Sequence, residues 1–186
     1  MDLVPTSLAD VVILTPRRFG DARGWFTETW NASRMAEAGL DLTFVQDNHS
    51  FSAAKGTLRG LHFQRPPRAQ DKLVRCSRGA ILDVAVDIRE GSPTYGRWVA
   101  VELTADNGRQ LLVPKGFLHG FVSLTDDTEV QYKCTDFYSP DDDGAVRWDD
   151  PALGIDWGIS APILSDKDAR APLLAEIGTP FRREAT

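Results

Sequence analysis

The middle of the chain alternates apolar and polar residues with a period of two, which is the signature of β-strands. In residues 80–88, Leu82, Val84, Val86 and Ile88 fall on one face, and Asp83, Ala85 and Asp87 fall on the other. The same alternation predicts further strands over Trp98–Leu103, Arg109–Val113, Phe117–Leu124 and Glu129–Tyr138.

Turn-forming residues separate these strands. Gly, Pro, Asn and Asp gather at 90–93, 105–108, 114–116 and 125–127, where they favour tight turns. Many short strands at this spacing are typical of an all-β sandwich or barrel. Helix is expected only as short peripheral segments, one over 31–38 that Gly39 ends and one that starts at Ser165. We expect a single domain over residues 1–186.

Composition narrows the classes of function. The formal net charge is −6, which disfavours generic binding to nucleic acid or to an anionic membrane. No apolar run approaches the ~20 residues that span a bilayer. Because residues 1–9 lack the basic start of a secretory signal, a cytoplasmic protein with Cys76 and Cys134 reduced is expected.

The three histidines, His49, His62 and His119, are too scattered for a typical metal site in a β-barrel. Such sites usually take a His-x-His pair whose side chains share a strand face, and this chain contains no such pair. We therefore expect no metal, which leaves the histidines available for acid–base chemistry.

Arg59 and His62 lie three residues apart, so a regular strand would send them to opposite faces. Gly60 stands between them, and a bulge there would let both side chains enter one cavity. The alternative, a surface arginine and a half-buried histidine in an ordinary strand, stays open.

For three other polar residues, the local sequence allows either a functional or a purely structural role. Lys72 shares a face with Val74 and Cys76, so it either points into the barrel mouth, where it would meet an anion, or is solvated at the strand end. Tyr132 can be a proton donor or simple packing. Ser165 and Asp168 resemble a capping box, whereas a functional reading pairs Asp168 with a histidine.

Several ordered segments together resemble the dTDP-4-dehydrorhamnose 3,5-epimerase family, from about residue 13 to residue 172. These segments are Asp21–Gly24, Gln46–Ser50, Leu58–Gln64, Lys72–Cys76, Asp83–Asp87, Ser92–Gly96, Gly116–Phe121, Tyr132–Lys133 and Ser165–Asp168. The resemblance implies a cupin-like jelly-roll β-barrel or sandwich that needs no metal or other cofactor and works as a homodimer.

The resemblance also implies roles for individual residues. His62 would be the base, Asp168 its partner, Tyr132 the proton donor and Lys72 the group that stabilises the C4 oxyanion. Arg23 and Glu28 would reach the partner subunit's site, and Asp143 stands where the family has a glutamate. The substrate-binding positions would be Arg23, Phe26, Glu28, Gln46, Asp47, Asn48, Arg59, His119, Tyr138, Asp143 and Lys167.

The implied reaction inverts C3 and C5 of a dTDP-linked 4-keto-6-deoxyhexose. The C4 ketone acidifies the protons at both carbons, and an imidazole, with its reference pKa of ~6.5, is neutral enough near pH 7 to remove them. The alternatives are an epimerase acting at C3 alone or C5 alone in antibiotic-sugar biosynthesis, a metal-dependent cupin oxygenase and a non-catalytic sugar-nucleotide binding module.

Overall fold

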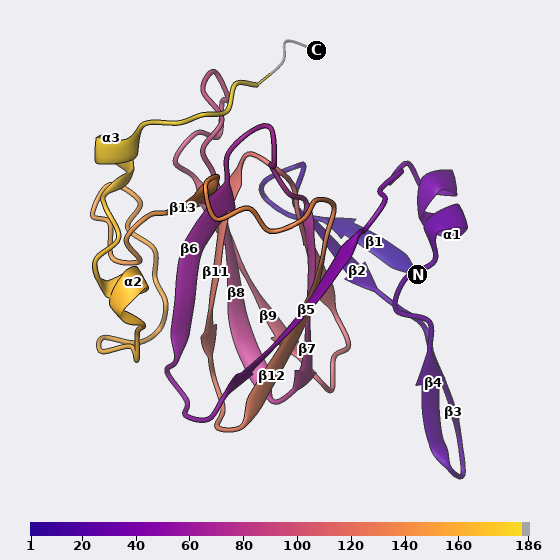
Figure 1. Cartoon of the computed structure of the whole chain (residues 1–186). Helices are drawn as coiled ribbons and strands as arrows, with labels where there is room; N and C mark the ends of the chain where they lie inside the picture. The colour runs from indigo at the N-terminus through magenta and orange to yellow at the C-terminus, as the bar shows by residue number, and fades with distance from the viewer. Residues whose placement is uncertain (184–186) are drawn as a thin grey trace.

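Two antiparallel sheets face each other and form the body of the protein (Figure 1). The computed structural model describes residues 1–183; residues 184–186, the end of the domain expected over 1–186, lie outside the described part. The six-stranded sheet has the order β1-β2-β10-β7-β12-β5, the five-stranded sheet has the order β13-β6-β11-β8-β9, and the β3–β4 hairpin stands apart from both. The strands are β1 (Asp2–Pro5), β2 (Val12–Thr15), β3 (Arg18–Asp21), β4 (Gly24–Thr27), β5 (Gln46–Ser52), β6 (Leu58–Gln64), β7 (Lys72–Arg78), β8 (Ala80–Asp87), β9 (Trp98–Thr104), β10 (Gln110–Val113), β11 (Phe117–Ser123), β12 (Thr128–Cys134) and β13 (Asp143–Ala145).

The alternating side chains of β8 form two faces, and both faces are buried. Ile81 and Ala85 belong to the core between the two sheets. Val84 and Val86 belong to a second core, in which the five-stranded sheet packs against residues of the C-terminal segment such as Trp157. The strand is therefore sandwiched between layers, and Asp83 and Asp87 face the barrel interior with no exposed surface.

The helices are short and peripheral, as the sequence predicts. Helix α1 (Ala32–Glu37) begins at Asn31, whose side chain accepts a hydrogen bond from the Arg34 backbone N–H. Met35 on α1 belongs to a third small core, together with side chains of the six-stranded sheet. Helices α2 (Asp166–Ala169) and α3 (Leu174–Ile177) lie outside the five-stranded sheet in Figure 1. No helix among residues 1–183 is long and apolar enough to span a membrane.

The strand expected over residues 129–138 is shorter than predicted. It ends at Cys134, after which the Thr135 backbone N–H bonds to the Asp71 carbonyl outside the ladder. Tyr138 is therefore on a loop, and its backbone N–H donates to the Gln46 side chain instead of to a strand.

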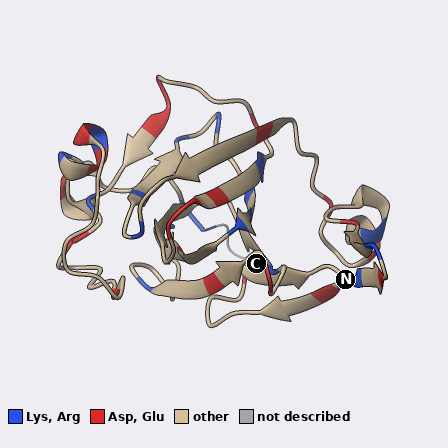
Figure 2. Ribbon diagram, turned by 90° about the horizontal axis from the view of Figure 1, so that it is seen from below, with Lys and Arg blue, Asp and Glu red and all other residues tan. Residues whose placement is uncertain are grey.

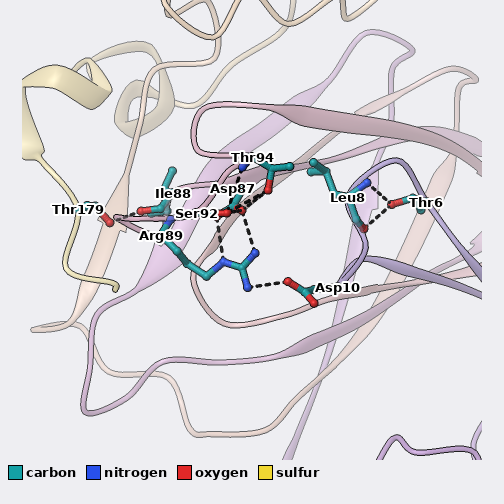
Figure 3. A network of polar contacts seen from close by, with 9 residues as sticks. All are labelled: Thr6, Leu8, Asp10, Asp87, Ile88, Arg89, Ser92, Thr94 and Thr179. Carbon is teal, nitrogen blue, oxygen red and sulfur yellow. Dashed lines mark hydrogen bonds and ion pairs between the residues drawn. The ribbon is translucent and has the colours of Figure 1, made fainter. Parts of the chain in front are cut away.

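A buried polar network holds the turn after β8 (Figure 3). Asp87 is fully buried, and its two oxygens accept hydrogen bonds from the Arg89 guanidinium and from the hydroxyls of Ser92 and Thr94. Arg89 also pairs with Asp10 at 2.8 Å. Burial acts to raise the pKa of Asp87, but these donors outweigh it and lower the pKa to about 2.

Candidate active site

A cavity of about 410 Å³ is bounded by side chains from both sheets and from the segment around α2. An adjoining hollow of about 280 Å³ shares four of its residues: His62, Lys72, Tyr132 and Lys167. Volumes of this size suit a small-molecule ligand.

The side chains expected to carry chemistry come from opposite walls. His62 lies on β6 of the five-stranded sheet, whereas Lys72 on β7 and Tyr132 on β12 lie on the six-stranded sheet. Because these sheets face each other, the imidazole and the phenol approach the cavity from opposite sides. A planar molecule between them would meet one ring on each face.

A bulge in β6 brings Arg59 and His62 into the same cavity. Where β6 pairs with β11, His62 faces His119 but Arg59 faces Phe121, so three steps on β6 match two on β11. Gly60 has a φ of +119°, and a Cβ there would lie 2.7 Å from the Gly120 Cα. The predicted bulge is confirmed, and glycine is required because the backbones approach so closely.

His62 and Asp168 form a tight pair at the cavity wall. His62 Nε2 lies 2.6 Å from Asp168 Oδ1, and the carboxylate is buried. The Ser165 hydroxyl accepts from the Asp168 backbone N–H and caps α2, whereas the Asp168 carboxylate bonds to His62, so only half of the expected capping box is formed and the pairing with a histidine is observed. Burial acts to raise the pKa of Asp168, but hydrogen bonds from His62 and from the Gly60 backbone outweigh it and lower the pKa.

The pKa values of Lys72 and Tyr132 shift in opposite directions, and burial is the main cause of both shifts. Burial lowers the pKa of Lys72 because it disfavours the ammonium, while the charges of Asp143 and Asp83 act in the other direction. Burial raises the pKa of Tyr132, with Arg59 opposing it. The phenol therefore keeps its proton at neutral pH and can donate it.

A second histidine–aspartate pair lies at the same cavity. His119 Nε2 is 2.8 Å from Asp83 Oδ1, and both side chains are buried. Among residues 1–183, only two buried side-chain polar atoms lack a hydrogen-bond partner, Ser50 Oγ and Asp83 Oδ2. Ser50 lines the cavity directly, and Asp83 contacts it through His119. Neither residue was predicted from the sequence to belong to the site, although Asp83 visibly interrupts an apolar strand.

Most of the remaining predicted substrate-binding residues line one of the two hollows. Arg59 and His119 line the main cavity. The adjoining hollow contains a connected polar wall in which Gln46 accepts from the Tyr138 backbone and Lys167 pairs with Asp143. Its predicted members are Gln46, Asn48, Tyr138, Asp143 and Lys167.

Four predicted site residues do not line either hollow. Alternation along β5 places Asp47 on the outer face, where it is 71% exposed and pairs with Lys133. Arg23 pairs with Asp21, and Phe26 is exposed on the β3–β4 hairpin. Glu28, just after β4, pairs with Arg34 of α1. Figure 1 shows this hairpin projecting away from the two sheets.

No three His, Cys, Asp or Glu side chains within residues 1–183 gather as metal ligands would. Charges of both signs are mixed along the ribbon in Figure 2. That the protein functions without a metal stays a prediction from the sequence.

Residues 5–176 match the family model described as dTDP-4-dehydrorhamnose 3,5-epimerase. The chain belongs to this family. The dTDP-4-dehydrorhamnose 3,5-epimerase of Salmonella typhimurium is 54% identical over 176 residues, which cover 94% of this chain and 96% of the relative. The expected cupin-like jelly roll is confirmed by the structures of other epimerases of this family.

Two solved structures of epimerases from this family superpose closely on the chain. That of dTDP-6-deoxy-D-glucose-3,5-epimerase from Legionella pneumophila, in complex with dTDP-4-keto-L-rhamnose, has a TM-score of 0.92 at 45% identity and covers 99% of both chains. That of dTDP-4-dehydrorhamnose 3,5-epimerase from Bacillus anthracis, with TDP and PPi bound, has a TM-score of 0.91 at 51% identity and covers 93% of this chain and 99% of its own.

Proposed function

We propose that this protein converts dTDP-4-dehydro-6-deoxy-D-glucose to dTDP-4-dehydro-L-rhamnose, a step of dTDP-L-rhamnose biosynthesis. The observation that carries the proposal is the His62–Asp168 pair on one cavity wall, opposite Tyr132 and Lys72 on the other. Family membership supports the same isomerase activity.

His62 would remove the proton from C3 and the proton from C5, because both carbons lie next to the C4 ketone. With Asp168 ionised, His62 donates its Nε2–H to the carboxylate, which leaves Nδ1 as the proton acceptor. Asp168 fixes this tautomer and stabilises the imidazolium once it forms. The carbanion is delocalised as an enolate, whose charge develops on the C4 oxygen.

Lys72 and Tyr132 would complete the inversion. The Lys72 ammonium stabilises the enolate oxygen, and a donor at such a position is typically worth ~10²–10³ in rate. Tyr132 then protonates the flat carbon from the face opposite His62. One base and one acid on opposite faces invert each centre, and between the two inversions His62 gives its proton to solvent and Tyr132 regains one from solvent. No redox cofactor is required by this chemistry.

The nucleotide would bind around Arg59 and the adjoining hollow. Arg59 lines the cavity and presents a planar guanidinium, which suits bidentate contact with a diphosphate. Tyr138, exposed beside Asp143 and Lys167, offers a ring on which a base can stack. The net charge of −6 does not prevent this, because Arg59, Lys72 and Lys167 line the two hollows.

A homodimer would bring the remaining predicted residues to the site. The β3–β4 hairpin exposes Phe19, Trp25 and Phe26, and contiguous exposed apolar side chains often mark a protein interface. Arg23 at its tip and Glu28 at its base would then enter the partner's cavity.

The buried free thiols of Cys76 and Cys134 support a reducing, cytoplasmic location.

The decisive experiment follows deuterium from solvent into the sugar by proton NMR. Wild-type protein in deuterium oxide should label both C3 and C5, and His62→Ala should abolish both exchanges while the circular dichroism spectrum stays native. His49→Ala is the matched control, because His49 lies exposed on β5 and pairs with Glu129. Label at one carbon only would identify a C3- or C5-specific epimerase, and wild-type exchange in folded His62→Ala would overturn the assignment of the base.

The shared site is tested with a mixed dimer. One differently tagged chain carries His62→Ala, and the other carries Arg23→Ala with Glu28→Ala; each is expected to be inactive alone. The purified mixed dimer has one barrel with an intact His62 and an intact partner hairpin, so it should recover about half of the wild-type activity. An inactive mixed dimer, or a monomer in light scattering, would refute hairpin exchange.

A further inference from the structure

Asp83 is a fully buried carboxylate that only one hydrogen bond within residues 1–183 satisfies. It lies in the middle of β8, facing the barrel interior, with no exposed surface. Its Oδ1 accepts from His119 Nε2 at 2.8 Å, and its Oδ2 has no donor. A buried carboxylate with one unpaired oxygen costs folding free energy, so stability alone does not explain an aspartate at this position.

Asp87, four residues further along the same strand, shows what a purely structural carboxylate looks like here. It is equally buried, but both of its oxygens are saturated by Arg89, Ser92 and Thr94 (Figure 3). These partners tie down the turn after β8 and lie away from the cavity. Asp83 has no comparable set of donors, and its one partner, His119, lines the cavity.

The other group that Asp83 acts on is Lys72. Burial penalises the Lys72 ammonium, and the negative charge of Asp83 offsets part of that penalty. The other titratable groups facing Lys72 are Asp143 on β13, which also favours the ammonium, Lys167 on α2, which opposes it, and the buried thiol of Cys134. The other titratable side chains that line the two hollows with Lys72 are His62, His119, Tyr132, Tyr138 and Asp168, and Arg59 adds a fixed positive charge.

We propose that Asp83 is a positioning residue that keeps Lys72 charged and His119 oriented. Its Oδ1 fixes the His119 Nε2–H, which leaves Nδ1 of that imidazole for the cavity. Its unsaturated carboxylate supplies negative potential at Lys72, so that the ammonium stays charged while it stabilises the substrate oxyanion. This inference rests on the proposed function, in which Lys72 stabilises the C4 oxyanion.

The proposal predicts the direction of a pH effect. The Lys72 charge is lost as pH rises, and a neighbouring carboxylate makes that loss occur at higher pH. Removing the carboxylate charge must therefore move the alkaline limb of activity to lower pH. A mere loss of stability would leave the limb in place and lower the amount of active protein.

The first test is Asp83→Asn, with deuterium exchange measured from pH 6 to pH 10. We expect kcat to fall at least ~10-fold near pH 8, KM to change less than ~3-fold, and the alkaline limb to move down by about one pH unit. Asp87→Asn is the matched control, because it removes an equally buried carboxylate from the same strand. It should lower the melting temperature and leave the limb unchanged. An unshifted limb in folded Asp83→Asn would overturn the proposal.

The second test compares the unsubstituted protein with Asp83→Asn by NMR and needs no turnover. Carbon-13 NMR of aspartate- and lysine-labelled protein should show the Asp83 Cγ ionised at neutral pH and a Lys72 Cε that titrates earlier in Asp83→Asn. Assignment uses Lys72→Met. A protonated Asp83 at neutral pH would sink the inference even if Asp83→Asn fails to fold. Because this readout is independent of activity, absent epimerisation in the wild type would count against the proposed function alone.

Discussion

Replacing Asp87 with asparagine should destabilise the protein in a pH-dependent way. The substitution keeps the size of the side chain but replaces one acceptor oxygen with an NH₂ group and removes the charge. Asp87 accepts from Arg89 at 2.8 Å and from the hydroxyls of Ser92 and Thr94 at 2.6 Å each. Asparagine must break part of this set, while Arg89 keeps its ion pair with Asp10.

The pKa of Asp87 sets the size of the pH effect. Its folded pKa of about 2 lies below the ordinary value of 3.8, and each unit corresponds to ~1.4 kcal/mol, so ionisation contributes about 2 kcal/mol. Because the folded pKa is depressed, this contribution is complete above pH ~4 and is lost as pH falls toward 2. At pH 3 about 1 kcal/mol of it is already gone. With the lost hydrogen bonds, we expect Asp87→Asn to cost about 2–4 kcal/mol at pH 7.

Urea unfolding at pH 7, 5, 4 and 3 measures this directly. The difference between wild type and Asp87→Asn should be constant from pH 7 to pH 5 and shrink by about 1 kcal/mol at pH 3. The exposed Asp106, changed to asparagine, serves as the control and should stay within ~0.5 kcal/mol of wild type. A pH-independent difference would show that the carboxylate charge does not contribute as the structure indicates.

Further predictions concern the site itself. Tyr132→Phe should spare deuterium wash-in more than epimer formation, because only reprotonation needs the phenol; equal losses would exclude it as the donor. Asp168→Asn should lower kcat by about 10²-fold or more without unfolding the protein, since it removes the group that fixes the imidazole tautomer; a smaller loss in steady-state assays would contradict this. Gly60→Ala should cost about 2–4 kcal/mol in urea unfolding because its Cβ would meet Gly120, whereas Gly154→Ala, in open space, should cost only the ~1 kcal/mol of its backbone conformation. Prolonged dialysis against a chelator should leave turnover unchanged, and metal-restored activity would favour the oxygenase alternative.

Local pattern was sufficient to predict the strands in the middle of the chain. The alternation over residues 80–88 and the turn residues after it predicted β8 and its neighbours within one or two residues of their observed ends. The glycine between Arg59 and His62 indicated where a bulge would form, because glycine is a poor strand residue unless the backbone bends, but it left an ordinary strand open as the alternative. These features depend on residues that are close in sequence.

The features that could not be predicted depend on residues far apart. His62 and Asp168 are 106 positions apart, and nothing near Ser165 indicates which strand its helix will pack against. Alternation in β8 could not tell which face turns inward, because both faces are buried and a one-residue change of register would exchange them. Asp83 was therefore noticed but not assigned to the cavity. The β3–β4 hairpin and α3 were not predicted from the sequence.

The pairing of His62 with Asp168 also sets an order of events during biosynthesis. Asp168 follows all thirteen strands of residues 1–183 in the chain, so a ribosome must release the whole barrel before the carboxylate can reach the imidazole. A polypeptide still being translated can assemble both sheets while the His62 imidazole still lacks its carboxylate partner. With the roles proposed above, the nascent chain gains its full activity only when the segment that carries Asp168 docks.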